Sequence, residues 1–468
     1  MGPSALFRPL AGLWALLALV AVAAAMLCGA LGESHLSPLF LASAAVAGIP
    51  GVLVLTATRG MKVSATAIDA VLLAFIAWVT TPAFASIPLY LSGYFTLPDA
   101  LFEAYSATTT TGATLADPGD LPRIMVLWRA LLGWTGGYAT LVIAAAVFAA
   151  LDRDLPAIRR SALLTIRPDN VFSHLGVAAR RIALIYSLLT VLFMIGLMFA
   201  GNGLFEATVL AMGSISTTGV LPVLPEETLS QLTMTGFWIV VACLCGSLNV
   251  SLFWDALRDR SSFNDPDLYG MLALVLGASV TFYLATGSGL FEHVANAVLL
   301  VSTSGYHIGN DVIPVGLVAI FVALIGGAAA STTGGVKITR ILMLWKRMGA
   351  ELAMLSDPSS VVPVSFRGRV AKDKALIAVW SYVLAFVVVL GLGALFVAMA
   401  GAAFDISMVA TASALSNAGP LLDQITGEPL AWTDLSENAR SVLIPVMILG
   451  RLEVIAALTA VWALFLRR

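Results

Sequence analysis

The residues TTTTGATLADP at positions 108–118 lie between two apolar segments that are each long enough to cross a membrane. Threonine and glycine are poor helix formers, so this stretch interrupts the helical pattern on either side of it. Peptide groups that leave a helix inside a membrane need partners from protein or water. The stretch therefore indicates a non-helical segment at membrane depth whose peptide groups are covered by protein or water.

The composition places the whole chain in a membrane. Its 468 residues are 59% hydrophobic and only 11% charged, with a mean hydropathy of +0.96 and a formal net charge of −2. A soluble protein of this length exposes far more charge, so the sequence predicts an all-α polytopic membrane protein. The near-neutral charge gives no reason to expect nucleic acid as a partner.

Ten segments are apolar over roughly 20 residues, the length of a membrane helix. They cover residues 9–31, 37–57, 67–92, 124–150, 182–201, 231–254, 268–286, 312–345, 375–400 and 441–466. The first is too long for a signal peptide and is interpreted as a retained helix. Lysines and arginines gather in the loops after even-numbered spans, most densely at 153–181 and 346–374. The positive-inside rule therefore predicts that both termini are cytoplasmic.

The opening stretch has three relatives in the same chain. They are SISTTGVLP at 214–222, VSTSGYHIG at 301–309 and ALSNAGPLL at 414–422. Each places hydroxyl or amide residues just before one glycine, and an acid precedes that glycine by thirteen residues, or by fourteen in the last repeat; the acids are Asp99, Glu206, Glu292 and Asp405. The intervening residues suffice for a helix that enters a membrane halfway but does not cross it.

The repeating unit is thus a span, a short re-entrant helix, a glycine-centred loop and a second span. We expect a two-helix appendage at residues 1–60, followed by four pseudo-symmetric pore units at residues 61–165, 166–262, 263–369 and 370–468. Irregular backbone in a membrane must be covered by protein or line a watery cavity. Four equivalent loops satisfy this requirement by meeting around one axial pore.

Such a meeting favours a cation. The negative ends of the four short helices would converge on the centre, and glycine lets carbonyls turn toward the axis because it adopts positive φ without steric cost. Carbonyls that replace water around an ion are the basis of potassium selectivity filters. The candidate ion-binding residues are Thr110, Thr111, Gly112, Ala113, Thr217, Thr218, Gly219, Val220, Thr303, Ser304, Gly305, Tyr306, Asn417, Ala418, Gly419 and Pro420. The alternative, packing glycines between helices, does not explain the shared upstream spacing.

Two features of the later spans also need an explanation. The eighth span is interrupted by glycine, serine and threonine between residues 326 and 335, either as a packing seam or as a flexible loop beneath the filter. Arg451 lies deep in the last span, where an arginine costs a few kcal/mol, so it should face a cavity with polar or acidic partners. A structural ion pair with another helix is the alternative for Arg451, and Glu453 points elsewhere on the helix.

These residues resemble the Trk/Ktr/HKT superfamily of potassium transporters, and most closely its bacterial TrkH branch, which carries two extra N-terminal spans. The likeness covers nearly the whole chain from about residue 65. Its motifs are ALFEAYSATTTTGAT at 100–114, LWRALLGWTGG at 127–137, GGAAASTTGGVKITR at 326–340 and ILGRLEV at 448–454. The chain departs from the family at Ser304, where threonine is usual, and at Ala418, in a weakly fixed position.

The resemblance implies potassium uptake across the bacterial cytoplasmic membrane, with K⁺ as the transported ion and no organic cofactor. In plant relatives a serine in place of the first filter glycine goes with sodium transport, so Gly112 favours potassium. The resemblance also implies an intramembrane gate and, at Arg451, an electrostatic barrier. The gate residues would be Gly326, Gly327, Ser331, Thr332, Thr333, Gly334, Gly335 and, at the cytoplasmic end, Lys337. The implied partners are a second copy of the chain, as a homodimer, and a cytoplasmic nucleotide-binding ring of the TrkA type.

The rival interpretation is a sodium- or proton-coupled symporter of potassium or another monovalent cation. Such carriers also use repeats and broken helices, but their repeats usually number two. A proton-coupled carrier should place a carboxylate deep in a span, and the clearest candidate, Asp69, lies near a helix end. The sequence has no phosphate-binding glycine loop, nucleophile elbow or zinc helix, so we expect no enzymatic activity.

Overall fold

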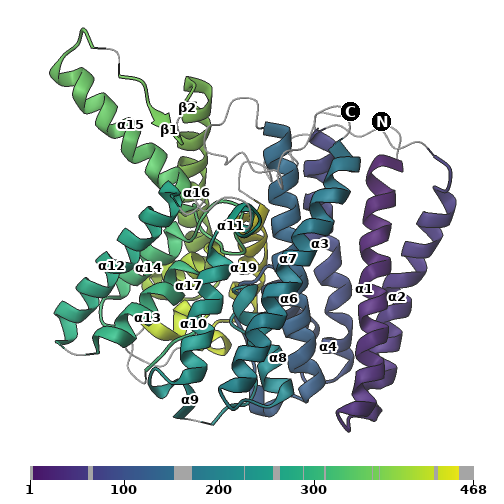
Figure 1. Cartoon of the computed structure of the whole chain (residues 1–468). Helices are drawn as coiled ribbons and strands as arrows, with labels where there is room; N and C mark the ends of the chain where they lie inside the picture. Colours follow the sequence, from purple (N-terminus) through teal and green to yellow (C-terminus); the bar gives the residue numbers. More distant parts are fainter. Residues whose placement is uncertain are drawn as a thin grey trace.

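The computed structural model describes residues 4–61, 67–151, 171–225, 227–256, 264–287, 289–309, 313–360, 362–367, 369–425 and 431–452. The described residues are mainly helical, as predicted, and the helices follow the order of the apolar segments (Figure 1). The exception is a short antiparallel hairpin of β1 (Ser365–Phe366) and β2 (Arg369–Val370).

The two N-terminal helices form a pair at one edge of the molecule, shown in purple in Figure 1. They are α1 (Ser4–Ala30) and α2 (Ser37–Ala57), joined by a 3-10 turn. Just before this turn, the Glu33 carboxylate accepts hydrogen bonds from the backbone amides of Arg123 (2.8 Å) and Ile124 (2.9 Å). Amides at a helix start have no partner inside their own helix. Glu33 therefore caps the helix that begins at Arg123 and ties the appendage to the first repeat.

The other helices repeat one pattern four times: a long helix, a short helix, a loop and a second long helix. The first long helices are α3 (Ala67–Ala85, extended by α4, Ile87–Leu91), α7 (Val171–Phe199), α12 (Pro266–Thr286) and α16 (Asp373–Met399). The second long segments are α6 (Arg123–Leu151), α10 with α11 (Met234–Ser247, Val250–Ala256), α14 with α15 (Gly316–Ile325, Ile338–Ser356) and α19 (Glu437–Leu452). Two small helices, α9 (Glu227–Ser230) and α18 (Leu421–Ile425), lie in the loops.

The short helices confirm the repeat predicted from the acid and glycine spacing. They are α5 (Leu97–Thr108), α8 (Leu204–Ile215), α13 (Leu290–Val301) and α17 (Phe404–Leu415), and each has twelve residues with its acid in the first turn. Twelve helical residues span about 18 Å, a little over half of a bilayer's hydrocarbon core. Each acid complements the positive end of its helix dipole.

One expected span is not a continuous helix. The segment predicted as a single span over residues 231–254 consists of α10 and α11, which meet at an angle of 92°. Leu248 is extended between them, and the Asn249 side chain accepts a hydrogen bond from the amide of Ser251 (2.9 Å). Asparagine is a preferred residue at a helix start, a signal that hydropathy alone does not detect. Asn249 therefore ends one helix direction and begins another.

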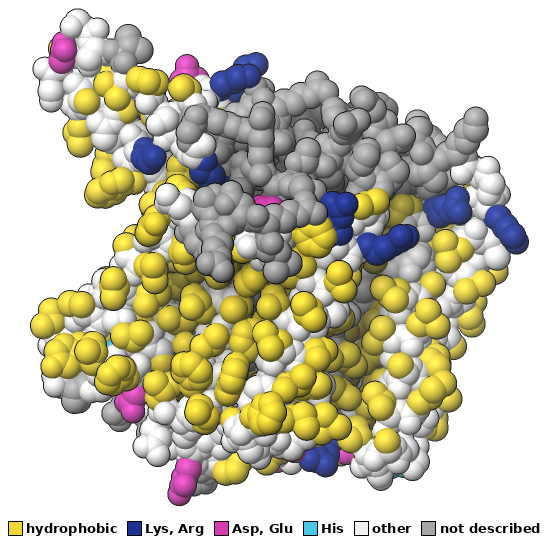
Figure 2. All heavy atoms as spheres, viewed as in Figure 1, with side chains coloured by type: hydrophobic (Ala, Val, Ile, Leu, Met, Phe, Trp, Pro, Cys, Tyr) yellow, Lys and Arg dark blue, Asp and Glu magenta, His cyan; other side chains and the backbone are white. Residues whose placement is uncertain are grey.

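The surface matches a protein that crosses a membrane several times. Six described helices are long and apolar enough to span a bilayer, and the bent pair α10 and α11 is a seventh candidate. Figure 2 shows hydrophobic side chains over the middle of the molecule, whereas lysines and arginines gather mainly toward one end. Exposed leucine, valine and phenylalanine side chains over such an area are stable only in contact with lipid or protein.

Candidate functional site

The backbone takes the same unusual turn after each short helix. Two residues before each glycine, φ is positive at a residue that is not glycine: Thr110 (56°), Thr217 (56°), Thr303 (53°) and Asn417 (52°). This left-handed conformation costs roughly 1–2 kcal/mol for a residue with a side chain. Four equivalent positions in otherwise different sequences share it, and backbone strain of this kind gathers at functional sites.

The glycines themselves follow the prediction in three repeats and depart from it in the fourth. Positive φ is confirmed at Gly112 (76°), Gly219 (75°) and Gly305 (72°). The same expectation is wrong for Gly419, whose backbone stays outside that region. Gly419 is required for another reason, since an added Cβ would collide with the backbone of Ala113 in the first loop.

The four loops form a closed ring. A Cβ at the glycine of each loop would collide with an atom of the next loop along the chain, and the last loop closes on the first. The colliding pairs are Gly112 with the carbonyl oxygen of Thr218, Gly219 with the carbonyl oxygen of Ser304, Gly305 with the ring of Pro420, and Gly419 with the amide of Ala113. The ring order is thus the order of the repeats, around one axis.

Hydrogen bonds lock the loops to one another. The Gly419 amide donates to the Thr111 carbonyl (2.6 Å), and the Asn417 side chain donates to the Thr111 hydroxyl (3.0 Å). Two residues outside the predicted set also hold loop carbonyls: Gln424 Nε2 donates to Gly305 (2.7 Å), and Trp432 Nε1 donates to Gly419 (3.1 Å). Neither residue belongs to the repeated pattern, so the repeats could not reveal them.

One set of carbonyl groups remains without a protein donor. Within the described ranges, no N–H or O–H group donates to the carbonyl oxygens of the four positive-φ residues, Thr110, Thr217, Thr303 and Asn417. These residues are buried, with at most 1% of their surface exposed. An unpaired buried carbonyl costs about 1–3 kcal/mol. Four equivalent ones in a ring form a site whose chemistry suits a cation.

The interruption predicted in the eighth span lies against one end of this ring. Helix α14 ends at Ile325 and α15 begins at Ile338, so the 326–337 loop between them is not a helical packing seam. The Gly334 amide donates to the Thr303 hydroxyl (2.9 Å), and the Thr332 hydroxyl donates to the carbonyl of Ile215 at the end of α8 (3.0 Å). The loop therefore touches the ring at the carboxyl ends of the short helices.

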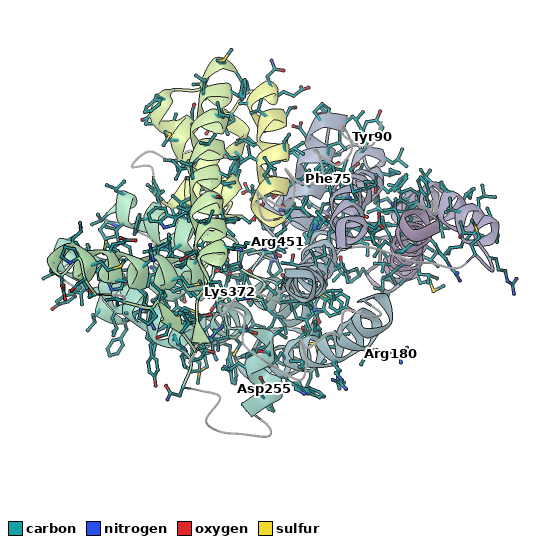
Figure 3. The ribbon with its side chains drawn as sticks, turned by 90° about the horizontal axis from the view of Figure 1, so that it is seen from above. Phe75, Tyr90, Arg180, Asp255, Lys372 and Arg451 are labelled. Carbon is teal, nitrogen blue, oxygen red and sulfur yellow. The ribbon has the colours of Figure 1, made fainter. Side chains whose placement is uncertain are left out.

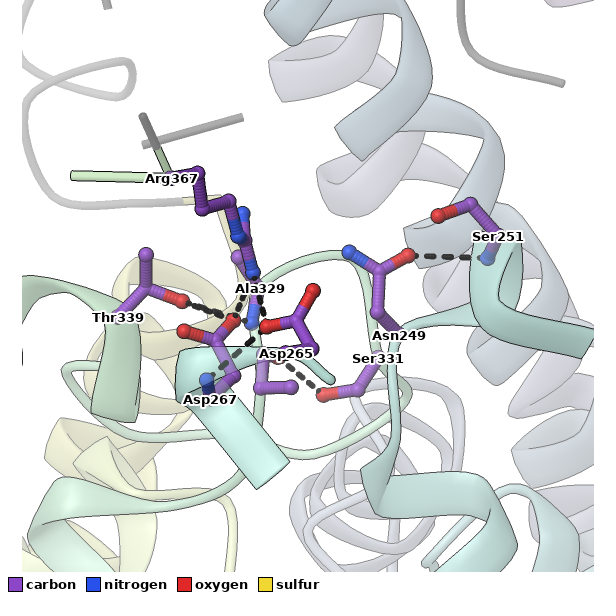
Figure 4. A network of polar contacts seen from close by, with 9 residues as sticks. Asn249, Ser251, Asp265, Asp267, Ala329, Ser331, Thr339 and Arg367 are labelled. Carbon is purple, nitrogen blue, oxygen red and sulfur yellow. Dashed lines mark hydrogen bonds and ion pairs between the residues drawn. The ribbon is translucent and has the colours of Figure 1, made fainter. Parts of the chain in front are cut away.

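The 326–337 loop is anchored on two sides, and Figure 4 shows the second of them, around Thr339, Asp267 and Arg367. On one side, the loop is joined to the bend between α10 and α11. The Ala328 amide donates to the carbonyl of Ser247 (3.0 Å), and the Val250 amide donates to the carbonyl of Ala330 (3.1 Å). On the other side, the Ala329 amide donates to the Thr339 hydroxyl (3.3 Å). Thr339 in turn donates to Asp267 (2.6 Å), which with Asp265 forms ion pairs with Arg367 of the β-hairpin.

Arg451 is also held by the 326–337 loop. It lies near the middle of the molecule viewed from above (Figure 3) and is 6% exposed. Its guanidinium donates to the carbonyls of Thr332 (2.6 Å) and Thr333 (3.1 Å) and to the hydroxyl of Thr140 (2.7 Å). Lys337 reaches the same carbonyl of Thr333 and the hydroxyls of Ser331 and Thr333. The expected polar partners of Arg451 are thus confirmed, and none of those described is a carboxylate; Glu453 lies outside the described residues.

Known proteins share this sequence and architecture. The chain matches the TrkH family, described as cation transport protein, over residues 39–224 and 301–464. The Trk system potassium uptake protein TrkH of Halomonas elongata is 28% identical over 423 residues, or 86% of each chain. Its counterpart in Escherichia coli K12 is 27% identical over 412 residues, or 83% of each chain. The crystal structure of the potassium transporter TrkH from Vibrio parahaemolyticus superposes with a TM-score of 0.86 at 22% identity, covering 100% of this chain and 99% of that one.

The fold and the ring define a class: multi-pass membrane proteins in which four pseudo-symmetric loops surround one axis. Within that class, the family match covers most of the sequence. The chain therefore belongs to the TrkH family of cation transport proteins.

Proposed function

We propose that this protein takes up potassium across the bacterial cytoplasmic membrane through the axis enclosed by the four loops. The carrying observation is the ring of buried, unpaired carbonyls at Thr110, Thr217, Thr303 and Asn417. The potassium uptake proteins among the relatives supply the identity of the ion.

The four loops supply the chemistry of a selectivity filter. A potassium ion entering the ring exchanges water for carbonyl oxygens, whose positions are fixed by the contacts between loops. The carboxyl ends of the four short helices point their negative dipoles at the same region, which lowers the energy of a cation there. Some carbonyls of the predicted set, such as that of Thr111, already accept a protein hydrogen bond and serve to hold the ring.

The 326–337 loop and Arg451 act together as the gate. The loop lies against the ring, and Arg451 and Lys337 place two positive side chains beside the carbonyl of Thr333. A positive charge at this point raises the energy of a cation that leaves the filter. Flux then depends on whether the loop and the arginine stay in this arrangement.

The protein works with both termini in the cytoplasm, as a homodimer, and under control of a cytoplasmic nucleotide-binding ring of the TrkA type. Support for this topology comes from the lysines and arginines in the even-numbered loops. Support for a regulatory partner comes from the relatives' designation as parts of a Trk system. The β-hairpin, linked through Arg367 to the 326–337 loop, offers one route by which such a ring reaches the gate.

The experiment is a selectivity measurement on Gly112→Ser. A side chain at Gly112 would strike the Thr218 carbonyl and displace the first two loops, so discrimination of K⁺ from Na⁺ should fall. Relative permeability is measured with purified protein in liposomes. Gly119→Ser is the matched control, because Gly119 follows the same loop and has open space around it. Unchanged selectivity of Gly112→Ser in folded protein would contradict the filter assignment.

A further inference from the structure

A buried ion pair supports the first loop from behind. Glu103 on α5 is completely buried, and Arg129 on α6 is nearly so; Arg129 Nε lies 2.9 Å from Glu103 Oε2. Removing two charges from water costs several kcal/mol per ion. Well-packed apolar residues of similar size often stabilise a protein at least as much as such an ion pair does. The pair therefore needs a role beyond joining two helices.

The second carboxylate oxygen of Glu103 supplies that role. Glu103 Oε1 accepts hydrogen bonds from the amide of Leu115 (2.5 Å) and the hydroxyl of Thr114 (2.9 Å). These two residues directly follow Ala113, the end of the predicted filter segment. Hydrogen bonds to a charged acceptor are shorter and stronger than neutral ones. One oxygen of Glu103 is thus held by Arg129, and the other holds the outward continuation of the first loop.

The pseudo-symmetry shows that this clamp recurs. Glu103 lies nine residues before Gly112, and Asn296 lies nine before Gly305. Asn296 Oδ1 accepts from the amide of Ile308 (2.8 Å), and its Nδ2 donates to the Ile308 carbonyl (2.7 Å). Leu115 and Ile308 each lie three residues after their glycines, so the same position performs the same task in the first and third repeats.

The second and fourth repeats lack this clamp. Their equivalent residues are Leu210 and Ala410, which have no polar side-chain atom. Because the loops follow one another around the ring in chain order, the first and third lie opposite each other. Two polar clamps therefore face each other across the axis, and two apolar positions lie between them.

We infer that Glu103, oriented by Arg129, is a positioning residue that sets potassium selectivity by holding the Leu115 amide, with Asn296 as its counterpart across the ring. The inference rests on the proposed function. The acceptor oxygen at position 103 fixes the outer end of the first loop, and its loss lets the carbonyls move relative to the ion. Arg129 forms an ion pair with the other oxygen and neutralises the buried charge.

Two double variants separate the acceptor from the charges. Glu103→Gln with Arg129→Gln removes both charges and keeps an oxygen facing the Leu115 amide. Glu103→Leu with Arg129→Met removes both charges and the acceptor, and apolar replacements of this kind usually fold. K⁺/Na⁺ permeability ratios in liposomes and thermal unfolding midpoints are measured for both. The K⁺/Na⁺ permeability ratio of the first variant should stay close to the wild-type value. That of the second should fall about tenfold, which corresponds to the free-energy cost of one unpaired buried amide.

Controls make each outcome decisive. Arg440→Gln breaks an ion pair with Asp99, which lies on α5 as Glu103 does, but away from the loop. This variant should leave selectivity unchanged. If the Leu/Met variant does not fold, Asn296→Leu removes the opposite clamp without touching a charge and should lower selectivity likewise. Wild-type selectivity in the folded Leu/Met or Asn296→Leu protein, or equal loss in both double variants, overturns the inference. Absence of selective flux in the wild type would instead overturn the proposed function.

Discussion

At the residue scale, Arg451 is a buried cation surrounded by neutral oxygens. Its three hydrogen bonds go to two backbone carbonyls of the 326–337 loop and one hydroxyl of α6. An arginine at the centre of a bilayer costs about 2.5–3.5 kcal/mol even on a lenient scale. Since no described carboxylate offsets its charge, Arg451 leaves a positive potential on the side of the ring where the 326–337 loop lies, as an electrostatic barrier requires.

Removing that charge should open the pathway. Arg451→Ala deletes both the barrier and two bonds to the loop, so rubidium flux into liposomes should increase roughly fivefold, corresponding to a barrier about 1 kcal/mol lower. The K⁺/Na⁺ permeability ratio should stay near the wild-type value because the ring is untouched. If correctly folded, membrane-inserted Arg451→Ala protein carried no flux, the arginine would be a structural residue.

Asp423 lies four residues after Gly419, next to Gln424, whose side chain holds the Gly305 carbonyl. The residue is exposed to water, while the protein around it partly desolvates its carboxylate. This partial burial, together with the negative charge of Asp434, raises the pKa of Asp423 to about 7. The negative charge beside the ring is therefore present above about pH 7 and is lost as the pH falls through that value.

Flux should follow this titration. In water, two unit charges that are separated by about 8 Å interact with about 0.5 kcal/mol, which corresponds to roughly a factor of two in local cation concentration. Rubidium uptake at subsaturating concentration should therefore fall about twofold between pH 8 and pH 6, and Asp423→Asn should be low and flat over this range. An unaltered pH profile in Asp423→Asn would remove Asp423 from the pathway.

The residues that the sequence identified share a pattern, and the ones it missed do not. The glycines were found because the same spacing to an acid recurs four times. The strain at Thr110 and its equivalents was not predicted, since nothing in a threonine marks left-handed backbone. Glu103 and Trp432 were missed because each acts on a loop atom that only the folded chain brings within reach.

At the element scale, the 326–337 loop is seated between the ring and the bend of α10 and α11. Gly334 makes a very close contact with the end of α17, since an added Cβ would collide with the carbonyl oxygen of Ser416. The loop therefore approaches the ring closely only because residue 334 has no side chain.

A methyl group at this point should displace the 326–337 loop from the ring. An overpacked contact costs about 1–3 kcal/mol, so Gly334→Ala should reduce the population of the seated loop and increase rubidium flux several-fold. Gly349→Ala, in open space on α15, is the matched control. Equal or lower flux in folded Gly334→Ala protein would show that the seated loop does not block the pathway.

Elements were predictable where hydropathy and helix-start signals agree. The four short helices carry their acids in the first turn and end before their glycines, as the spacing predicts. The bend between α10 and α11 was missed because residues 231–254 are predominantly apolar and carry no charge, and groups that stabilise the break come from the 326–337 loop, about eighty residues later.

At the scale of the whole molecule, one architecture accounts for the polar stretches in an apolar chain. Each loop is incomplete alone and is covered by the next, so irregular backbone survives at membrane depth only because the four repeats close a ring. The fourfold repeat was readable from the sequence. The closure itself was not, because it depends on contacts such as that of Gly419 with Ala113, about three hundred residues apart.

The most direct test is to locate the ion. Crystals of the protein grown with thallium, a heavy substitute for potassium, give an anomalous difference map. We predict a peak on the axis, within the ring formed by the carbonyls of Thr110, Thr217, Thr303 and Asn417. Thallium bound only elsewhere, with no density on this axis, would contradict it.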